Sequence, residues 1–264
     1  MNTDMNDTGV VVEQRGEGIV QIRLNRPERM NALGVDMTLA LERAITAAIA
    51  ARARVILVRG TGRAFCAGAD LKERRTMDEP TRVLHNRQIN AAVDALAAAP
   101  MPTIAVINGL ALGGGCEIAI ACDFRIAAED AQIGLTEARI GAIPGAGGTQ
   151  RLPRLIGAAR AMEMILTGEP VTAQRAADIG LVNTVVASDA LDAHAERLAG
   201  VLASRSPSGA ATAKRLIYRG LEVPLADALQ LEHAALKDIL ASADYAEGLA
   251  AFADKRAPRF GRGS

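Results

Sequence analysis

The sequence is poor in aromatic side chains and carries no net charge. It has four Phe, two Tyr and no Trp, and its 30 Lys and Arg residues are balanced by 30 Asp and Glu residues. So few aromatics leave little surface on which nucleic-acid bases could stack. A neutral chain also exerts no overall attraction on nucleic acid or on an anionic membrane surface. We therefore expect neither a nucleic-acid partner nor a membrane partner.

Cysteine and histidine are scarce as well. Cys66, Cys116 and Cys122 lack the C-x-x-C spacing of zinc and redox sites, and the three histidines are isolated along the chain. We therefore expect no metal site and no disulfide framework. The sequence also lacks the phosphate-binding loop, the dinucleotide fingerprint, H-E-x-x-H and G-x-S-x-G. These absences disfavour nucleotide-dependent, metal-dependent and serine-nucleophile chemistry.

Long apolar segments are missing too. No apolar run reaches the roughly 18 residues that a membrane-spanning helix needs. Residues 1–6 are polar and lack the basic and apolar regions of a signal peptide. Free cysteines in apolar surroundings are typical of a reducing compartment. We expect a soluble, cytoplasmic protein, in which 264 half-hydrophobic residues provide a large core.

The apolar pattern predicts an α/β core followed by a helical region. Short runs at 10–13 and 19–24, on either side of a glycine turn, predict a β-hairpin. An N-cap at Asp36 is expected to begin the first helix. Buried strands that alternate with helices indicate parallel pairing. Further strands are predicted at 55–58, 103–107, 124–127 and 181–186, and helices at 81–99, 158–166, 190–204, 208–220, 226–240 and 245–254.

Glu117 is the only polar side chain between Leu110 and Cys122, and it follows three consecutive glycines at the start of a predicted buried helix. Burying a carboxylate is costly, so such a group acquires a raised pKa or a specific partner. The alternative is that Glu117 turns to solvent in the first helical turn, where its charge favours the helix dipole. The residues alone leave both interpretations open.

Glu137 lies twenty positions further on, just before the glycine-rich segment 141–148. Two carboxyl groups beside glycine-lined turns, without metal ligands nearby, suit general acid–base work on a neutral carbon skeleton. Taken alone, Glu137 is more typical of the first residue of a helix than of a catalytic group.

Segment 63–71 consists largely of small residues and follows the predicted strand at 55–58. Its backbone N–H groups could point at a ligand oxygen, as could those of the three glycines that precede Glu117. An ordinary strand-to-helix loop is the alternative.

Together these segments resemble the enoyl-CoA hydratase/isomerase family, also called the crotonase family. The resemblance spans nearly the whole chain, with its motifs in the family's order and spacing. The motifs lie at 24–33, 65–71, 108–123, 143–152 and 252–256. The resemblance implies an α/β fold, a crotonase-like spiral of ββα units. It places an acyl-CoA site in a core of residues 1–200 and a helical trimerisation region at 201–264.

The resemblance also implies roles for individual residues. The backbone N–H groups of Ala69 and Gly114 would form an oxyanion hole for the thioester oxygen. Glu117 would activate a water, Glu137 would deliver a proton to the α-carbon, and the N–H of Gly145 would help to position the water. The remaining implied substrate-binding residues are Ala67, Gly68, Asp70, Leu71, Gly113 and Lys255, the last reaching the CoA of a neighbouring subunit.

The implied activity is reversible syn addition of water to a trans-2-enoyl-CoA, giving a 3-hydroxyacyl-CoA, as in fatty acid or related acyl-CoA degradation. Coenzyme A is part of the substrate, and no other cofactor is expected. The alternatives are enoyl-CoA isomerisation and hydration of a branched or carboxylated enoyl-CoA. A non-catalytic RNA-binding role is disfavoured by the neutral charge and the few aromatics, and a scaffold role would require the two glutamates to be solvated.

The resemblance leaves the CoA contacts and the assembly open. Related hydratases often carry Lys where this chain has Glu28, so Arg26, Arg29 and Lys72 are the candidates for binding the CoA phosphates. Self-association as a trimer or hexamer is expected.

Overall fold

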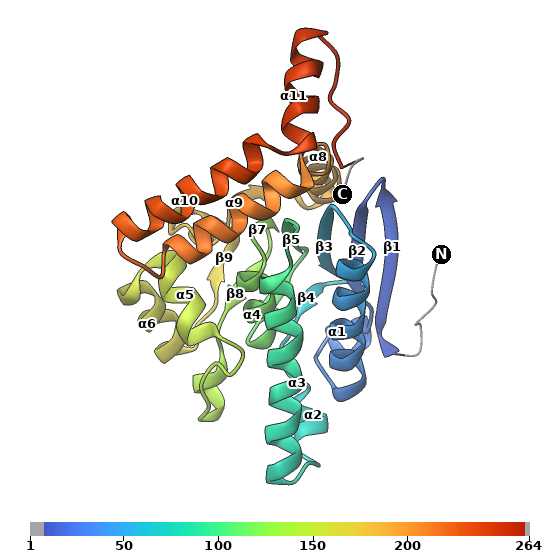
Figure 1. Cartoon of the computed structure of the whole chain (residues 1–264). Coiled ribbons are helices and arrows are strands. Elements are labelled where there is room, and N and C mark those ends of the chain that lie inside the picture. Colours follow the sequence, from blue (N-terminus) through green and yellow to red (C-terminus); the bar gives the residue numbers. More distant parts are fainter. Residues whose placement is uncertain (1–7, 262–264) are drawn as a thin grey trace.

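Two β-sheets form the centre of the molecule in the computed structural model, which describes residues 8–261 (Figure 1). The larger sheet has six strands in the order β1-β2-β3-β5-β7-β10, and the smaller has four in the order β4-β6-β8-β9. The larger sheet comprises β1 (Val10–Gly16), β2 (Ile19–Leu24), β3 (Val55–Gly60), β5 (Thr103–Ile107), β7 (Phe124–Ala128) and β10 (Thr184–Val186). The smaller comprises β4 (Ala64–Cys66), β6 (Leu110–Leu112), β8 (Gln132–Gly134) and β9 (Val171–Thr172).

Strand pairing in the larger sheet follows the apolar pattern of the sequence. β1 and β2 form the predicted antiparallel hairpin, and β2, β3, β5, β7 and β10 pair in parallel. Val55 to Val58 of β3 and all of β5 are buried, as expected for strands covered on both faces. The predicted α/β class is therefore confirmed.

Three successive ββα units wind through both sheets. In each unit the first strand joins the larger sheet, the second joins the smaller sheet, and a helical segment follows. The strands of the units are β3–β4, β5–β6 and β7–β8. The helical segments that follow them are α2 (Leu71–Arg74), α4 (Gly114–Ala121) and η3 (Glu137–Ile140). This arrangement is the expected spiral. As a result, the carboxyl end of the second strand in each unit lies near the start of the helical segment that follows it.

Helices cover both faces of the larger sheet (Figure 1). On one face α1 (Val35–Ala50), α3 (Glu79–Ala98) and α4 build the main core. On the other face α8 (Leu191–Ala203) contributes Leu191, Ala195, Ala199 and Ala203 to a second cluster with the outward side chains of β3, β5 and β7. These four residues recur every fourth position and so form one apolar stripe on the helix.

Several predicted boundaries differ from the structure, and two of the differences have a clear physical reason. Gly34, not Asp36, occupies the N-cap of α1, and Asp36 lies in the first turn, where an acidic group still favours the helix dipole. The strand predicted at 181–186 begins only at Thr184. Leu181 and Val182 are buried in the turn after α7 (Ala173–Asp178), where both N–H groups donate to the carbonyl of Ala176.

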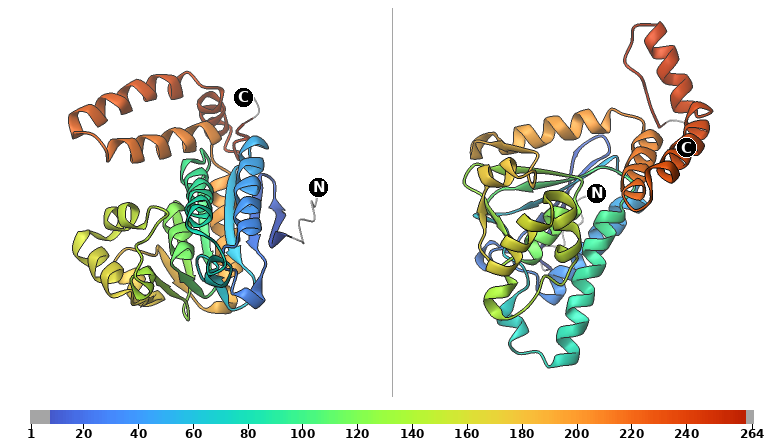
Figure 2. Two further views of the ribbon diagram at one scale, coloured as in Figure 1. Left: turned by 90° about the horizontal axis from the view of Figure 1, so that it is seen from below. Right: turned by 90° about the vertical axis from the view of Figure 1, so that its left-hand side faces the viewer.

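The carboxy-terminal region is helical, as predicted. After α5 (Gly148–Ile156) and α6 (Ala158–Thr167), the region contains α9 (Pro207–Gly220), α10 (Leu225–Leu240) and α11 (Ala243–Ala253). α9 and α10 run side by side, and α11 projects away from the sheets (Figures 1 and 2). Phe252 on α11 is 87% exposed. Within residues 8–261 no helix is long and apolar enough to cross a membrane.

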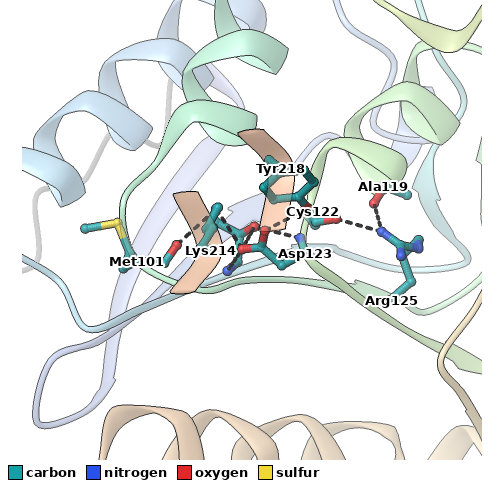
Figure 3. Close-up of polar contacts among 8 residues, drawn as sticks. Met101, Ala119, Cys122, Asp123, Arg125, Lys214 and Tyr218 are labelled. Atoms are coloured by element: carbon teal, nitrogen blue, oxygen red, sulfur yellow. Dashed lines mark hydrogen bonds and ion pairs between the residues drawn. The ribbon is translucent and has the colours of Figure 1, made fainter. Parts of the chain in front are cut away.

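Asp123 ties α9 to the core (Figure 3). Its Oδ2 accepts hydrogen bonds from the N–H and hydroxyl of Thr103 at 2.8 and 2.9 Å. Lys214 of α9 reaches the same oxygen at 2.7 Å, and the hydroxyl of Tyr218 donates to Oδ1 at 3.0 Å. The side chains of Asp123 and Lys214 are only 12% and 11% exposed. The helical region is therefore anchored directly after α4.

Candidate active site

A pocket opens between α2, the start of α4 and the loop that follows β8. It has a free volume of about 110 Å³ and is partly open to solvent. Its wall consists of Ala67, Gly68, Ala69, Leu71, Arg74, Asn86, Ile89, Gly113, Gly114, Glu117, Thr136, Glu137, Ile140, Ala142, Ile143 and Gly145. The segment at 63–71, the start of the helix that carries Glu117, and the segment from Glu137 into the glycine-rich loop therefore meet at this pocket.

The N–H groups of Ala69 and Gly114 lie close together in this pocket. A Cβ placed on Gly114 would be 3.7 Å from the nitrogen of Ala69. Neither N–H has an acceptor among the hydrogen bonds of the described residues. Gly68 turns the chain with a φ of +89°, and a Cβ there would lie 2.8 Å from the carbonyl oxygen of Leu112. Two unpaired backbone donors in a pocket of small residues suit an oxyanion hole.

The motif at 30–33 holds this turn in place through hydrogen bonds. The side-chain amide of buried Asn31 donates to the carbonyls of Thr61, Ala64 and Phe65, which fixes the approach to the turn. Leu33 then bridges the turn, because its N–H donates to Gly68 at 2.7 Å and its carbonyl accepts from Asp70 at 3.0 Å. The N–H of Ala69, which lies between these two contacts, is left for a ligand.

Glu117 is buried, with 3% of its surface exposed. Its Oε1 accepts hydrogen bonds from the N–H groups of Ala146 and Gly148 at 2.7 and 2.8 Å. Burial raises the pKa of this carboxyl group, and the two N–H donors partly offset the rise because they stabilise the anion. The alternative in which Glu117 turns to solvent was wrong, because the glycine-rich segment folds over it.

Glu137 begins the short helix η3, so it is also the helix-start residue that its position suggested. Its Oε2 is buried and has no hydrogen-bond partner among the described residues. Burial, together with the charge of Glu117, raises the pKa of Glu137 to about 7. The two carboxyl groups therefore form an interacting pair that retains a proton near neutral pH.

The carbonyl of Gly145 is held by two asparagines of α3. Asn90 donates to it at 2.6 Å and Asn86 at 3.1 Å. Because these contacts fix the peptide, they also fix the loop that supplies the donors to Glu117. The sequence reasoning missed both asparagines. Their spacing of four residues on one helix face was the available signal, but polar residues at that spacing are equally typical of a solvated surface.

Two arginines stand around the same loop and were also missed. Arg151 donates to the carbonyl of Ala146 at 2.8 Å and pairs with Asp94 at 2.6 Å. Arg74 lines the pocket, and its Nη2 lies 3.4 Å from Oδ1 of Asn86. Burial lowers the pKa of Arg74, although the neighbouring glutamates counteract this effect.

Most of the other implied substrate-binding residues lie at the pocket. Ala67, Gly68, Leu71 and Gly113 line it. Asp70 does not. It is buried at the N-cap of α2, where Oδ1 accepts from the N–H groups of Lys72 and Glu73 at 3.1 and 3.2 Å. Its Oδ2 lies 4.0 Å from Arg26 and 3.8 Å from Arg29.

Lys255 follows α11 and is not part of the pocket wall of this chain. Its implied contact with the CoA of a neighbouring subunit stays a prediction. No cluster of three His, Cys, Asp or Glu side chains that could hold a metal ion occurs among residues 8–261.

Comparison with known proteins agrees with this geometry. The sequence model of the enoyl-CoA hydratase/isomerase family matches residues 14–263. The protein YngF of Bacillus subtilis (strain 168) is 46% identical over 244 residues, which cover 92% of this chain and 94% of YngF. Methylglutaconyl-CoA hydratase of Rattus norvegicus is 40% identical over 255 residues, covering 94% of this chain and 81% of that protein.

The fold agrees equally well with a solved structure. The crystal structure of enoyl-CoA hydratase from Bacillus anthracis superposes with a TM-score of 0.93 at 43% sequence identity, covering 96% of this chain and 98% of that one. The family's sequence model matches nearly the whole chain, and the fold matches that of a solved enoyl-CoA hydratase. The chain therefore belongs to the enoyl-CoA hydratase/isomerase family.

Proposed function

We propose that the protein is an enoyl-CoA hydratase, which adds water reversibly and syn to a trans-2-enoyl-CoA. The observation that carries the proposal is the presence of two carboxyl groups, buried Glu117 and half-buried Glu137, in one pocket with the unpaired N–H groups of Ala69 and Gly114. An isomerase has no need of two such groups, because a single base can take a proton from one carbon and return it to another.

The thioester oxygen accepts hydrogen bonds from Ala69 and Gly114, which stabilise the negative charge that develops on it. Glu117, ionised and held through Oε1, takes a proton from water as the water oxygen bonds to C3. Glu137, still protonated near neutral pH because of its raised pKa, gives its proton to C2. The N–H of Gly145 orients the water. Addition is syn because both carboxyl groups act on the same face of the double bond.

Each contribution has a typical size. A preorganised oxyanion donor is worth about 10²–10³ in rate. A positioned general acid or base contributes about 10²–10⁴. Removing either glutamate should therefore reduce turnover by several orders of magnitude.

The test follows the loss of the enoyl-thioester absorbance of crotonyl-CoA, with identification of the product. Glu117→Gln and Glu137→Gln should each lower kcat by at least about 100-fold while acyl-CoA binding survives. Glu129→Gln, at an exposed carboxylate outside the pocket, is the matched control and should keep wild-type turnover. Unchanged turnover in both pocket variants, or an isomer as the sole product, would falsify the proposal.

A second candidate is hydration of a branched or carboxylated enoyl-CoA. Its support is the similarity to a protein named methylglutaconyl-CoA hydratase. Values of kcat/KM over a panel of enoyl-CoA esters of different length, branching and charge would decide between the two candidates.

The same proposal includes self-association through the helical region, as a trimer or hexamer. Its support is the number of large apolar side chains left exposed on α9 to α11, among them Ile217, Leu221, Leu249 and Phe252. Sedimentation equilibrium tests it, and a monomer at micromolar concentration contradicts it. In such an assembly Lys255 would reach the CoA bound by a neighbour.

A further inference from the structure

Arg74 brings a positive charge to the pocket wall without a carboxylate partner. Its Nε lies 3.4 Å from Nδ1 of His85, and its Nη2 lies 3.4 Å from Oδ1 of Asn86. Both contacts are long, and neither acceptor carries a charge. The Asn86 amide is neutral, and burial lowers the pKa of His85 so that its imidazole is neutral as well. Among the described residues no carboxylate oxygen lies within 4.0 Å of the Arg74 guanidinium.

Neither of the two pocket glutamates forms an ion pair with Arg74. Oε1 of Glu117 is already bound by two N–H groups, and Oε2 of Glu137 is buried without any partner among residues 8–261. A guanidinium has five N–H donors, so Arg74 retains several for a ligand. Arg74 is half-buried, so part of the cost of desolvating its guanidinium is not offset by a charged partner. An anionic ligand group in the pocket would remove that cost.

The surroundings of Arg74 indicate which part of a ligand it would meet. α2 begins directly after the oxyanion segment, and Arg74 is its last residue. Its Nη2 lies 3.4 Å from Oδ1 of Asn86, whose Nδ2 donates to the carbonyl of Gly145, so the guanidinium lies beside the loop that covers Glu117. In that position the guanidinium would meet the end of a short acyl chain whose reacting carbons lie between the two glutamates. Elsewhere the wall offers the apolar side chains of Leu71, Ile89, Ile140 and Ile143.

We propose that Arg74 selects acyl-CoA substrates that carry a carboxylate at the distal end of the acyl chain. The apolar side chains contact the carbon chain, and the guanidinium forms a charge-assisted, bidentate contact with the terminal carboxylate. This inference rests on the proposed function, since it names the substrate class of the same pocket. Arg74 is a specificity residue and takes no part in proton transfer.

A binding experiment tests the inference without turnover. Titration calorimetry compares glutaryl-CoA with pentanoyl-CoA, two saturated esters of equal chain length of which only the first carries a carboxylate. Wild-type protein should bind glutaryl-CoA about 10- to 100-fold more tightly, the range expected for a hydrogen bond between charged groups. Arg74→Met should abolish the preference. Arg74→Lys should retain part of it, since it keeps the charge but loses the planar fork.

Arg75→Met is the matched control. Arg75 is the next residue, is exposed and does not line the pocket, so its replacement should leave the preference intact. A wild-type protein without preference for glutaryl-CoA overturns the proposal. So does an equal loss of preference in Arg74→Met and Arg75→Met, because a general charge effect would then explain it.

Turnover separates this proposal from the proposed function. The ratio of kcat/KM for 4-carboxybut-2-enoyl-CoA to that for pent-2-enoyl-CoA should exceed one and should fall about 10- to 100-fold in Arg74→Met. If Arg74→Met lowers both values equally and displaces the pH–rate profile, Arg74 serves the glutamate pair and the proposal is wrong. If no enoyl-CoA is hydrated but the binding preference persists, hydratase function fails while carboxylate selection stands.

Discussion

Replacing Glu137 with Gln should stabilise the folded protein at neutral and alkaline pH while it removes a catalytic group. The pKa of Glu137 is raised from 4.5 to about 7, mainly because folding buries the carboxyl group. The unfolded chain releases the proton near pH 4.5, whereas the folded protein retains it until about pH 7. Between these values the folded state binds more protons, so stability falls as the pH rises.

The size of the effect follows from the two pKa values. A rise from 4.5 to about 7 corresponds to about 3 kcal/mol, since each tenfold change in proton affinity is worth 1.36 kcal/mol. Glu137 borders the open pocket, where solvent screens part of the cost, so we expect about 2 kcal/mol. Gln has nearly the shape of the protonated side chain and does not titrate. The variant should therefore match wild type near pH 4.5 and exceed its stability by about 2 kcal/mol above pH 7.

Urea unfolding of both proteins from pH 5 to pH 9 measures this difference. Glu129→Gln, at an exposed carboxylate, serves as the control and should run parallel to wild type. Parallel curves for Glu137→Gln and wild type over the whole range would show that folding does not raise the proton affinity of Glu137, and the acid role assigned to it would lose its basis.

Three further outcomes follow from the contacts of the site and its supports. Asn90→Leu removes the 2.6 Å contact to Gly145 and should lower kcat about 10-fold with little change in KM, whereas Arg87→Ala on the exposed side of α3 should change neither. Asp123→Asn leaves buried Lys214 without a charge partner and should lower the unfolding free energy in urea by about 3 kcal/mol, against at most about 1 kcal/mol for the exposed pair broken by Glu222→Gln. Burial raises the pKa of Cys66 to about 12, so the thiols should react with Ellman's reagent only on unfolding, and fast labelling of the native protein would contradict this.

Short apolar runs and helical apolar patterns made most of the fold predictable. The runs at 19–24 and 103–107 became β2 and β5 with the predicted bounds. All of β5 and four of the six residues of β2 are buried, and buried strands carry short, nearly continuous apolar runs. The strands of the smaller sheet escaped prediction. They are two or three residues long, which is too short for a period of two to emerge. α5 was also missed, since it begins at a glycine after a glycine-rich loop and contains Pro153.

The candidate site was predictable where a residue conflicts with its surroundings. Burying a carboxyl group among apolar residues, as at Glu117, costs free energy unless the group gains partners or a raised pKa. Such a residue therefore stands out in the sequence. Asn86, Asn90 and Arg74 involve no such conflict. The two asparagines lie on α3 and Arg74 lies on α2, at positions typical of a solvated helix surface. Only the tertiary approach of the loop at 144–148 brings the asparagines into contact with Gly145 and Arg74 into contact with Asn86. Contacts of that kind depend on packing between distant segments, which periodicity does not encode.

The position of α4 explains why the pocket is both lined by small residues and rigid. All eight of its residues are buried, and Gly115 packs directly on the carbonyl oxygen of Cys66, where a side chain would collide with backbone. At its other end the guanidinium of Arg125 binds the carbonyl of Cys122 at 2.6 Å, which satisfies a group that a helix end leaves unpaired. Gly114 and Glu117 lie on this one helix, so a single element sets both the oxyanion donor and the base. Asp123 follows the same helix and binds Lys214 of α9, so the helical region is fixed to the element that carries both groups.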